Sequence, residues 1–170
     1  FHMTKVGILR GGPSNEFDVS LKTGESVLNN LPEKFDLEDI LIDKKGNWLR
    51  KGKVCTPLEI SKNFDVVFNC LHGFYGEDGK VQQALDSLYI PYTGSKALGS
   101  ALAMNKVLAK RVYVNNGIRV PSHIVLTLED DLEKELFEIF RSYPIPLIVK
   151  PINSGSSVGI NLVYSFDDLK

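Results

Sequence analysis

The sequence predicts an α/β fold, with a largely parallel sheet in the first part of the chain and a smaller α+β part after it. Short apolar runs that end in glycine-rich turns alternate with stretches of helical spacing. The run at 65–71 is apolar almost throughout, as in a strand covered on both faces. After Pro121 the alternation gives way to strand signals joined by a Gly/Ser-rich loop. We therefore expect two domains, with a boundary between about Gly94 and Pro121.

The first domain is expected to contain strands, helices and one hairpin. Apolar runs predict strands at 5–9, 36–43, 65–71 and 90–94. Periodic apolar positions predict helices at 16–30 and 80–88. The basic run Lys44–Lys53 contains Trp48, which is a combination found in nucleic-acid sites. Acidic residues just upstream cancel most of the charge, so a solvated hairpin that turns at Gly46 explains the run better.

The second part of the chain predicts a long helix and then a mixed segment. Apolar positions at helical spacing predict one helix over 96–116, which ends at Gly117. The later elements expected are a strand at 122–126, a helix opened by a capping box at 127–130 and ending near 142, and strands at 147–150 and 159–164. Ser165 begins a last helix with only its first turn, which is unstable alone. We therefore expect the sequence to be part of a longer protein.

The composition excludes several classes of protein. Of the 170 residues, 43% are hydrophobic and 24% are charged, as in globular proteins. The net charge of −1 gives no field for nucleic acid or an anionic membrane, and no apolar run approaches the roughly 20 residues of a membrane span. Cys55 and Cys70 form no CxxC site or disulfide framework, which predicts free thiols and a cytoplasmic protein. The three histidines lack metal-ligand spacing.

The segment Lys150–Gly159 is the strongest candidate for chemistry. A lysine ends a strand, and a loop rich in glycine and serine follows it. Ammonium, hydroxyl and backbone N–H donors suit the β- and γ-phosphates of a nucleotide. The lysine precedes the loop and no helix follows, so this is not the phosphate loop GxxxxGK[ST]. The alternative interpretation is an ordinary hairpin connection with a surface lysine.

Two more loops follow predicted strands, at the place where open α/β sheets bind ligands. Leu71–Gly79 has three glycines together with His72 and Glu77, although a single histidine in a loop is more often structural. Gly11–Ser20 has two glycines but lacks the third glycine of a dinucleotide-binding fingerprint. Its Glu16 suits a cationic ligand such as an amino group, or simply favours the amino end of a helix.

Five segments together resemble the D-alanine–D-alanine ligase family of the ATP-grasp superfamily. In chain order they are GGPSNEFDVS (11–20), LHGFYGEDG (71–79), PYTGS (91–95), MNK (104–106) and KPINSGSSVG (150–159). Their order and spacing agree with the family over about residues 5–170. The resemblance implies a Rossmann-like N-terminal substrate domain at 4–95 and a partial ATP-grasp α+β central domain at 96–170. It also implies that the C-terminal ATP-grasp domain is absent.

The resemblance implies roles for individual residues. Glu16 matches the acid that holds the ammonium group of a first D-alanine, and His72 matches the histidine beside the reacting carboxylate. Ser156 matches a serine that is hydrogen-bonded in a group with that acid. The implied catalytic residues are therefore Glu16, Ser156 and His72, and the first and last of these also bind substrate. The implied ATP-binding residues are Lys106, Lys150, Gly155, Ser156 and Ser157.

The activity implied by the resemblance is ATP-dependent, ADP-forming synthesis of D-alanyl-D-alanine for peptidoglycan through an acyl phosphate. Mg²⁺ ligands are expected beyond Lys170, so the chain by itself is expected to be an inactive fragment without a metal site. D-alanine and ATP are the expected partners, without nucleic acid or membrane, and a homodimer is compatible with the resemblance. The alternatives are ligation to D-lactate or D-serine, another ATP-grasp carboxylate–amine ligation, and a non-catalytic D-amino-acid-binding module.

Overall fold

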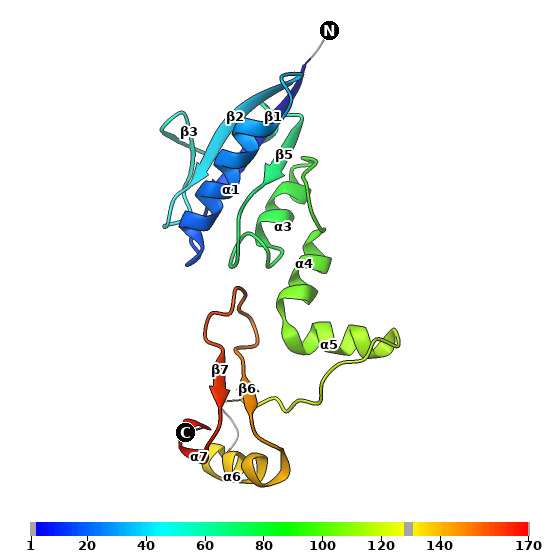
Figure 1. Cartoon of the computed structure of the whole chain (residues 1–170). Helices are drawn as coiled ribbons and strands as arrows, with labels where there is room; N and C mark the ends of the chain where they lie inside the picture. Colours follow the sequence, from blue (N-terminus) through cyan, green and yellow to red (C-terminus); the bar gives the residue numbers. More distant parts are fainter. Residues whose placement is uncertain (1–2, 128–130, 170) are drawn as a thin grey trace. The chain divides into compact units, whose positions relative to one another are not determined.

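The computed structural model describes residues 3–127 and 131–169, and the chain forms two compact units, Phe1–Met104 and Asn105–Lys170 (Figure 1). The first unit contains a five-stranded sheet with the strand order β4-β3-β2-β1-β5. Its strands are β1 (Thr4–Gly11), β2 (Phe35–Ile42), β3 (Trp48–Arg50), β4 (Lys53–Cys55) and β5 (Val66–Asn69). Its helices are α1 (Phe17–Asn30), α2 (Pro57–Ser61), α3 (Lys80–Ser87) and α4 (Ala97–Met104).

The predicted α/β class is confirmed, with a sheet that combines parallel and antiparallel strands. β1 lies between β2 and β5 and is parallel to both. The predicted hairpin is present, and β3 and β4 make the other edge antiparallel. In its turn Gly46 has a φ of +88°, and the carboxylate of Asp43 accepts the backbone N–H groups of Lys45 and Asn47. The run predicted as a strand at 90–94 contributes an isolated parallel bridge, between Val67 and Tyr92.

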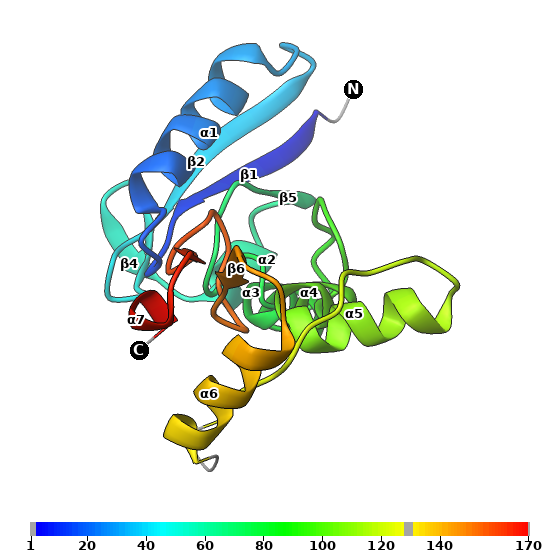
Figure 2. The ribbon, with the colours of Figure 1, turned by 60° about the horizontal axis from the view of Figure 1, so that its bottom comes forward.

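Helices cover both faces of this sheet (Figure 2). Successive side chains of β1 point to opposite faces, so Ile8 belongs to one buried cluster and Leu9 to the other. The Ile8 cluster packs against Val27 and Leu28 of α1, and the Leu9 cluster includes Val81 of α3. α1 connects β1 to β2, whereas α3 connects β5 to the bridge of Tyr92 on the other side of β5. Because these two connections run in opposite directions along the sheet, right-handed crossovers place α1 and α3 on opposite faces. Starting from β1, the chain first adds β2, β3 and β4 on one side and later adds β5 on the other.

An ion pair between β2 and β3 is expected to make the first unit sensitive to acid. Arg50 donates two hydrogen bonds to Glu38, at 2.6 and 3.0 Å, which lower the pKa of that carboxyl. A lowered pKa in the folded state stabilises the protein above the pKa of the unfolded chain, and this contribution disappears as the pH falls through the folded value. We expect Glu38→Gln to remove about 1 kcal/mol at pH 7 and almost nothing in acid. Urea unfolding at both pH values measures this, and the exposed Glu33→Gln is the control.

The second unit is smaller and has a two-stranded antiparallel sheet. Its elements are α5 (Lys106–Asn115), α6 (Leu132–Ser142), β6 (Leu147–Val149), β7 (Asn161–Val163) and α7 (Phe166–Leu169). β6 and β7 are the strands predicted on either side of the Gly/Ser loop. Phe166 of α7 makes edge contacts with the rings of Phe137 and Phe140 on α6. Ser165 caps α7 as predicted, because its hydroxyl accepts the backbone N–H of Asp168.

The single helix predicted over 96–116 is wrong, because the structure has two helices there. Asn105 separates α4 from α5 with an extended backbone, at φ −86° and ψ 106°. Its side chain accepts the backbone N–H groups of Val107 and Leu108, which makes it the N-cap of α5. Helix α4 belongs to the first compact unit, where a Cβ added to Gly79 would lie 2.5 Å from the backbone oxygen of Ala97.

Two other expectations for the second unit have different outcomes. The strand predicted at 122–126 is wrong, since the backbone there forms no regular element. The capping box expected at 127–130 includes 128–130, which lie outside the described residues. Asp131 caps α6 instead, through the backbone N–H of Lys134.

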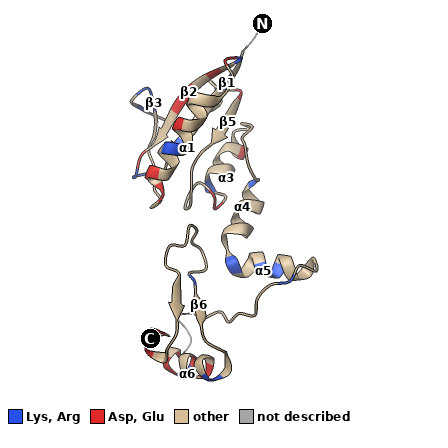
Figure 3. Cartoon of the chain, viewed as in Figure 1, with Lys and Arg blue, Asp and Glu red and all other residues tan. Residues whose placement is uncertain are grey.

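The distribution of charge follows the balanced composition. β2 carries acidic residues alone, whereas α1 and α6 carry residues of both signs (Figure 3). Among residues 3–127 and 131–169, no helix is both long and apolar enough to cross a bilayer.

Candidate functional site

Two of the predicted loops leave the sheet at one edge. Leu9 of β1 is in register with Asn69 of β5, and the strands are parallel, so the segments after Gly11 and after Asn69 both start at the carboxyl ends. This shared edge, which the sequence predicted, is confirmed. The connections from β1 and β5 diverge to opposite faces of the sheet here, and such points are where open α/β sheets bind ligands.

Ser14 ties the two loops together. Its hydroxyl donates to the backbone oxygen of His72 at 2.7 Å and accepts the backbone N–H of Glu16 at 3.1 Å. A Cβ added to Gly73 would lie 2.7 Å from a carboxylate oxygen of Glu16. The Glu16 carboxylate therefore lies against the backbone beside His72, although 56 positions separate these two residues in the sequence.

Hydrogen bonds within the unit fix the shape of the 71–79 loop. Glu77 accepts the backbone N–H of Gly73 at 2.6 Å, and Asn69 and Gln82 both donate to the backbone oxygen of Gly76, at 3.1 and 2.7 Å. Gly73 has a φ of +66°, which glycine adopts without strain. Glu77 thus has a structural role, and the loop presents His72 on a preformed backbone.

Sequence reasoning missed two residues of α1 that support this edge. Ser20 is fully buried; its hydroxyl accepts the N–H of Gly11 at 2.8 Å and donates to the backbone oxygen of Cys70 at 2.7 Å. Thr23, one turn later, places its hydroxyl 2.9 Å from Nε2 of His72. A local signal for both was present, because positions 16, 20 and 23 follow the i, i+4, i+7 spacing of one helix face.

Removing the Ser20 hydroxyl is expected to weaken the whole edge. Ser20→Ala leaves a buried N–H of β1 and a buried backbone oxygen after β5 without their partner, at a cost of about 1–3 kcal/mol. Urea unfolding measures this loss. Ser26→Ala, at an exposed position of the same helix, is the matched control and is expected to change stability by less than about 0.5 kcal/mol. Equal effects of the two substitutions would contradict this account of Ser20.

The second unit brings together the predicted phosphate-binding residues. Lys106, at the start of α5, donates from Nζ to the backbone oxygens of Pro151 and Ser154, at 2.7 and 2.5 Å. Burial, followed by the charge of Lys150, lowers the pKa of Lys106. The two lysines, 44 positions apart in the sequence, are thus close enough for their charges to interact.

The Gly/Ser loop has an unusual backbone. Ser156 and Ser157 have φ values of +48° and +60°, in the left-handed region that L-residues rarely adopt. Such conformations cost about 1–3 kcal/mol each, and ligand clamps and switch segments are among the places where they cluster. Within the loop, the Ser154 hydroxyl donates to the backbone oxygen of Val158 at 3.0 Å. Gly155 follows Ser154, so the five predicted ATP-binding residues all lie in this unit. The functional roles of Glu16, His72 and Ser156 stay predictions.

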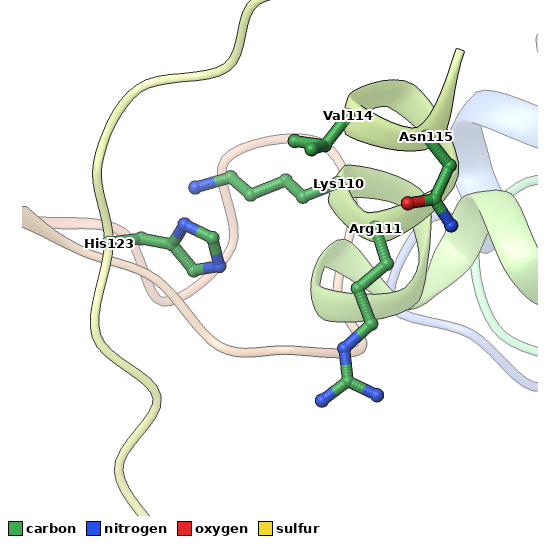
Figure 4. Close-up of a pocket in the computed structure, with 5 residues that line it drawn as sticks. All are labelled: Lys110, Arg111, Val114, Asn115 and His123. Atoms are coloured by element: carbon green, nitrogen blue, oxygen red, sulfur yellow. The ribbon is translucent and has the colours of Figure 1, made fainter. Parts of the chain in front are cut away.

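A separate pocket of about 280 Å³ lies beside α5 in the second unit (Figure 4). Lys110 extends from the helix towards His123 of the following segment. The lining residues are Lys110, Arg111, Val114, Asn115 and His123. None was predicted, because residues of a helix and of an irregular segment share no motif. Within the part of the chain that the structure describes, no group of three His, Cys, Asp or Glu residues could hold a metal ion.

Two family models match most of the chain. The model described as D-ala D-ala ligase N-terminus matches residues 5–63 and 55–95, and the model described as D-ala D-ala ligase C-terminus matches residues 112–170. Among curated proteins, the D-alanine–D-alanine ligase of Bacillus anthracis is 38% identical over 166 residues, covering 97% of this chain and 51% of that protein. The ligase of Geobacter sulfurreducens is 38% identical over 166 residues, covering 98% and 49%.

Solved structures show the same likeness. The D-alanine-D-alanine ligase from Coxiella burnetii superposes with a TM-score of 0.84 at 27% identity, over 97% of this chain and 58% of that one. The VanG D-Ala:D-Ser ligase from Enterococcus faecalis gives a TM-score of 0.80 at 30% identity, over 95% of this chain and 55% of that one. The chain therefore spans about half the length of the curated relatives that it matches.

Proposed function

The chain belongs to the D-alanine–D-alanine ligase family, and we propose that it supplies the first-substrate site and the triphosphate site of an enzyme that joins two D-alanines for peptidoglycan. One observation carries the proposal. The Glu16 carboxylate lies against Gly73, beside His72, at the edge of the sheet where its connections diverge. A carboxylate in that position suits the ammonium group of an amino acid, whose carboxylate then extends along the His72 loop.

The chemistry of the proposed reaction explains why this site contains charges and few strong bases. ATP supplies the phosphoryl group that turns the carboxylate of the first D-alanine into an acyl phosphate, from which the amine of the second D-alanine displaces phosphate. Such chemistry depends mainly on positioning and on neutralising negative charge. Glu16 holds the first substrate by its ammonium group, His72 borders its carboxylate, and Ser156 is the third catalytic residue that the resemblance implies.

The residues of the second unit fit a triphosphate. Lys106 is partly desolvated and interacts electrostatically with Lys150, so an anion between the two ammonium groups would relieve their repulsion. The hydroxyl and N–H groups of Gly155, Ser156 and Ser157 add neutral donors around that anion. Among the described residues, no group of three His, Cys, Asp or Glu side chains is placed to hold a metal ion. In this proposal the Mg²⁺ ligands belong to the region that the resemblance places beyond Lys170.

The domain assignment, location and partners belong to the same proposal. We assign the substrate domain to 4–95 and the ATP-grasp domain to 96–170, although the first compact unit continues through α4 to Met104. The free thiols Cys55 and Cys70 support a cytoplasmic location, and burial raises the pKa of Cys70 to about 11, which keeps that thiol unreactive. D-alanine and ATP are the proposed substrates, and a homodimer is compatible with the family.

A chimeric enzyme, called the joined ligase below, tests this function. It consists of this sequence followed by the second half of the Bacillus anthracis relative, because the chain covers 51% of that protein. We expect release of phosphate that requires both ATP and D-alanine, with D-alanyl-D-alanine identified by mass spectrometry. The 170 residues alone are expected to release no phosphate above a control without enzyme. A folded joined ligase that makes no dipeptide, or phosphate release by the chain alone, contradicts the proposal.

Ligation to D-serine is the second candidate function. The TM-score of 0.80 with a D-Ala:D-Ser ligase supports it, because the same fold serves that enzyme. The features that select the second substrate are expected beyond Lys170. An assay of the joined ligase with D-serine and D-lactate as second substrates therefore measures the selectivity of its second half. We expect that half to prefer D-alanine.

A further inference from the structure

The ring of His72 has a hydrogen-bond partner on helix α1, Thr23, which has no role in the proposed reaction. Oγ1 of Thr23 lies 2.9 Å from Nε2 of His72 and 3.1 Å from the backbone oxygen of Val19. Both the threonine and the histidine are half-buried. The backbone of His72 is held separately, because its oxygen accepts from Ser14 and the next residue donates to Glu77. Thr23 is thus the contact that fixes the ring.

The direction of this hydrogen bond follows from the single proton of the Thr23 hydroxyl. The Thr23 hydroxyl has one proton and two neighbours, the oxygen of Val19 and Nε2 of His72. The Val19 oxygen has no proton to give, so it can only accept. A threonine within a helix commonly donates to the oxygen four residues earlier, and Val19 has that position. With its proton used there, Thr23 can only accept from the ring, and Nε2 of His72 must carry hydrogen.

We propose that Thr23 is a positioning residue that holds His72 as the tautomer with hydrogen on Nε2. The lone pair of the neutral ring is then on Nδ1, which points away from α1 because the two ring nitrogens face nearly opposite directions. The statement about the substrate rests on the proposed function: Nδ1 is the ring atom that meets the first D-alanine or the incoming amine. An accepting Nδ1 can take a proton from an amine, which the other tautomer cannot do.

Nuclear magnetic resonance of the ¹⁵N-labelled chain tests the tautomer directly. The His72 ring is assigned by its loss in His72→Asn, and two-bond ¹H–¹⁵N correlations at a pH where the ring is neutral show which nitrogen carries hydrogen. We expect a protonated Nε2 and a bare Nδ1 in the wild type and in Thr23→Ser. In Thr23→Val, the Nε2 proton is expected to exchange with water about tenfold faster, because its acceptor is gone.

Either of two results overturns the proposal: a bare Nε2 with hydrogen on Nδ1 in the wild type, or an unchanged exchange rate in Thr23→Val. If the valine variant loses the dispersed spectrum of a folded chain, Thr23→Ala answers the same question. In the joined ligase, Thr23→Val is expected to lower kcat about tenfold with the KM for ATP unchanged, and Thr23→Ser to stay within about twofold. An inactive wild-type joined ligase counts against the proposed function and leaves the tautomer result standing.

Discussion

Replacing Lys150 by alanine is expected to lower kcat/KM for ATP in the joined ligase about 100- to 1000-fold. Lys150 directly follows β6 at the start of the Gly/Ser loop, and its charge acts on Lys106. Two ammonium groups at short distance repel each other, and an anion bound between them lowers that repulsion. Removing one leaves a triphosphate with half of its cationic partners at the point where negative charge moves during phosphoryl transfer.

Initial rates at low ATP measure this effect. Lys134→Ala is the matched control, because it removes the same charge from an exposed position on α6 of the same unit. Its kcat/KM is expected to stay within about twofold of the wild type, as for most surface substitutions. A Lys150→Ala ligase with near wild-type kcat/KM at low ATP contradicts the assignment of Lys150.

Gly73→Ala is expected to raise the KM for D-alanine about 10- to 100-fold while the protein stays folded. The new methyl group would lie 2.7 Å from the Glu16 carboxylate, so the flexible end of Glu16 has to move away. A hydrogen bond to a charged group contributes about 1.5–3 kcal/mol, which corresponds to that range of affinity. The φ of +66° at this position adds about 1–2 kcal/mol of backbone strain, which lowers stability and not substrate binding.

Gly46→Ala separates the two effects of that substitution. Gly46 has a φ of +88° in the β2–β3 turn, and an added Cβ there would meet no atom within 4 Å. It therefore reports backbone strain without any displacement of Glu16. We expect both variants to lose similar stability in urea, and only Gly73→Ala to raise the KM for D-alanine. An increase of similar size in both would mean that Glu16 does not hold the substrate.

The position of the site could be predicted from the sequence because it depends on topology. Apolar runs locate β1 and β5, and parallel neighbouring strands end at one edge whatever loops follow them. The loops with Glu16 and His72 had to meet there. The phosphate loop was visible for a similar reason, because β6 and β7 flank a Gly/Ser segment.

The supporting contacts could not be predicted in the same way. Ser20 and Thr23 bond to Cys70 and His72, which are 50 and 49 positions away, so the partners are set by packing and not by local pattern. The helix break at Asn105 had a local signal, since asparagine is a strong N-cap. The apolar periodicity on both sides of it continued and concealed the break. The side-chain cap of Asn105 sets a helix boundary that hydrophobic spacing alone does not reveal.

Titration of the ¹⁵N-labelled chain with D-alanine tests the central claim most directly, namely that the carboxylate of Glu16 holds the substrate ammonium at the edge of the sheet. We predict saturable shifts of backbone amides in 12–16 and 72–77, and their disappearance in Glu16→Gln, which keeps the shape of the side chain and removes its charge. Shifts that persist in Glu16→Gln, or that arise away from these two loops, would contradict the account.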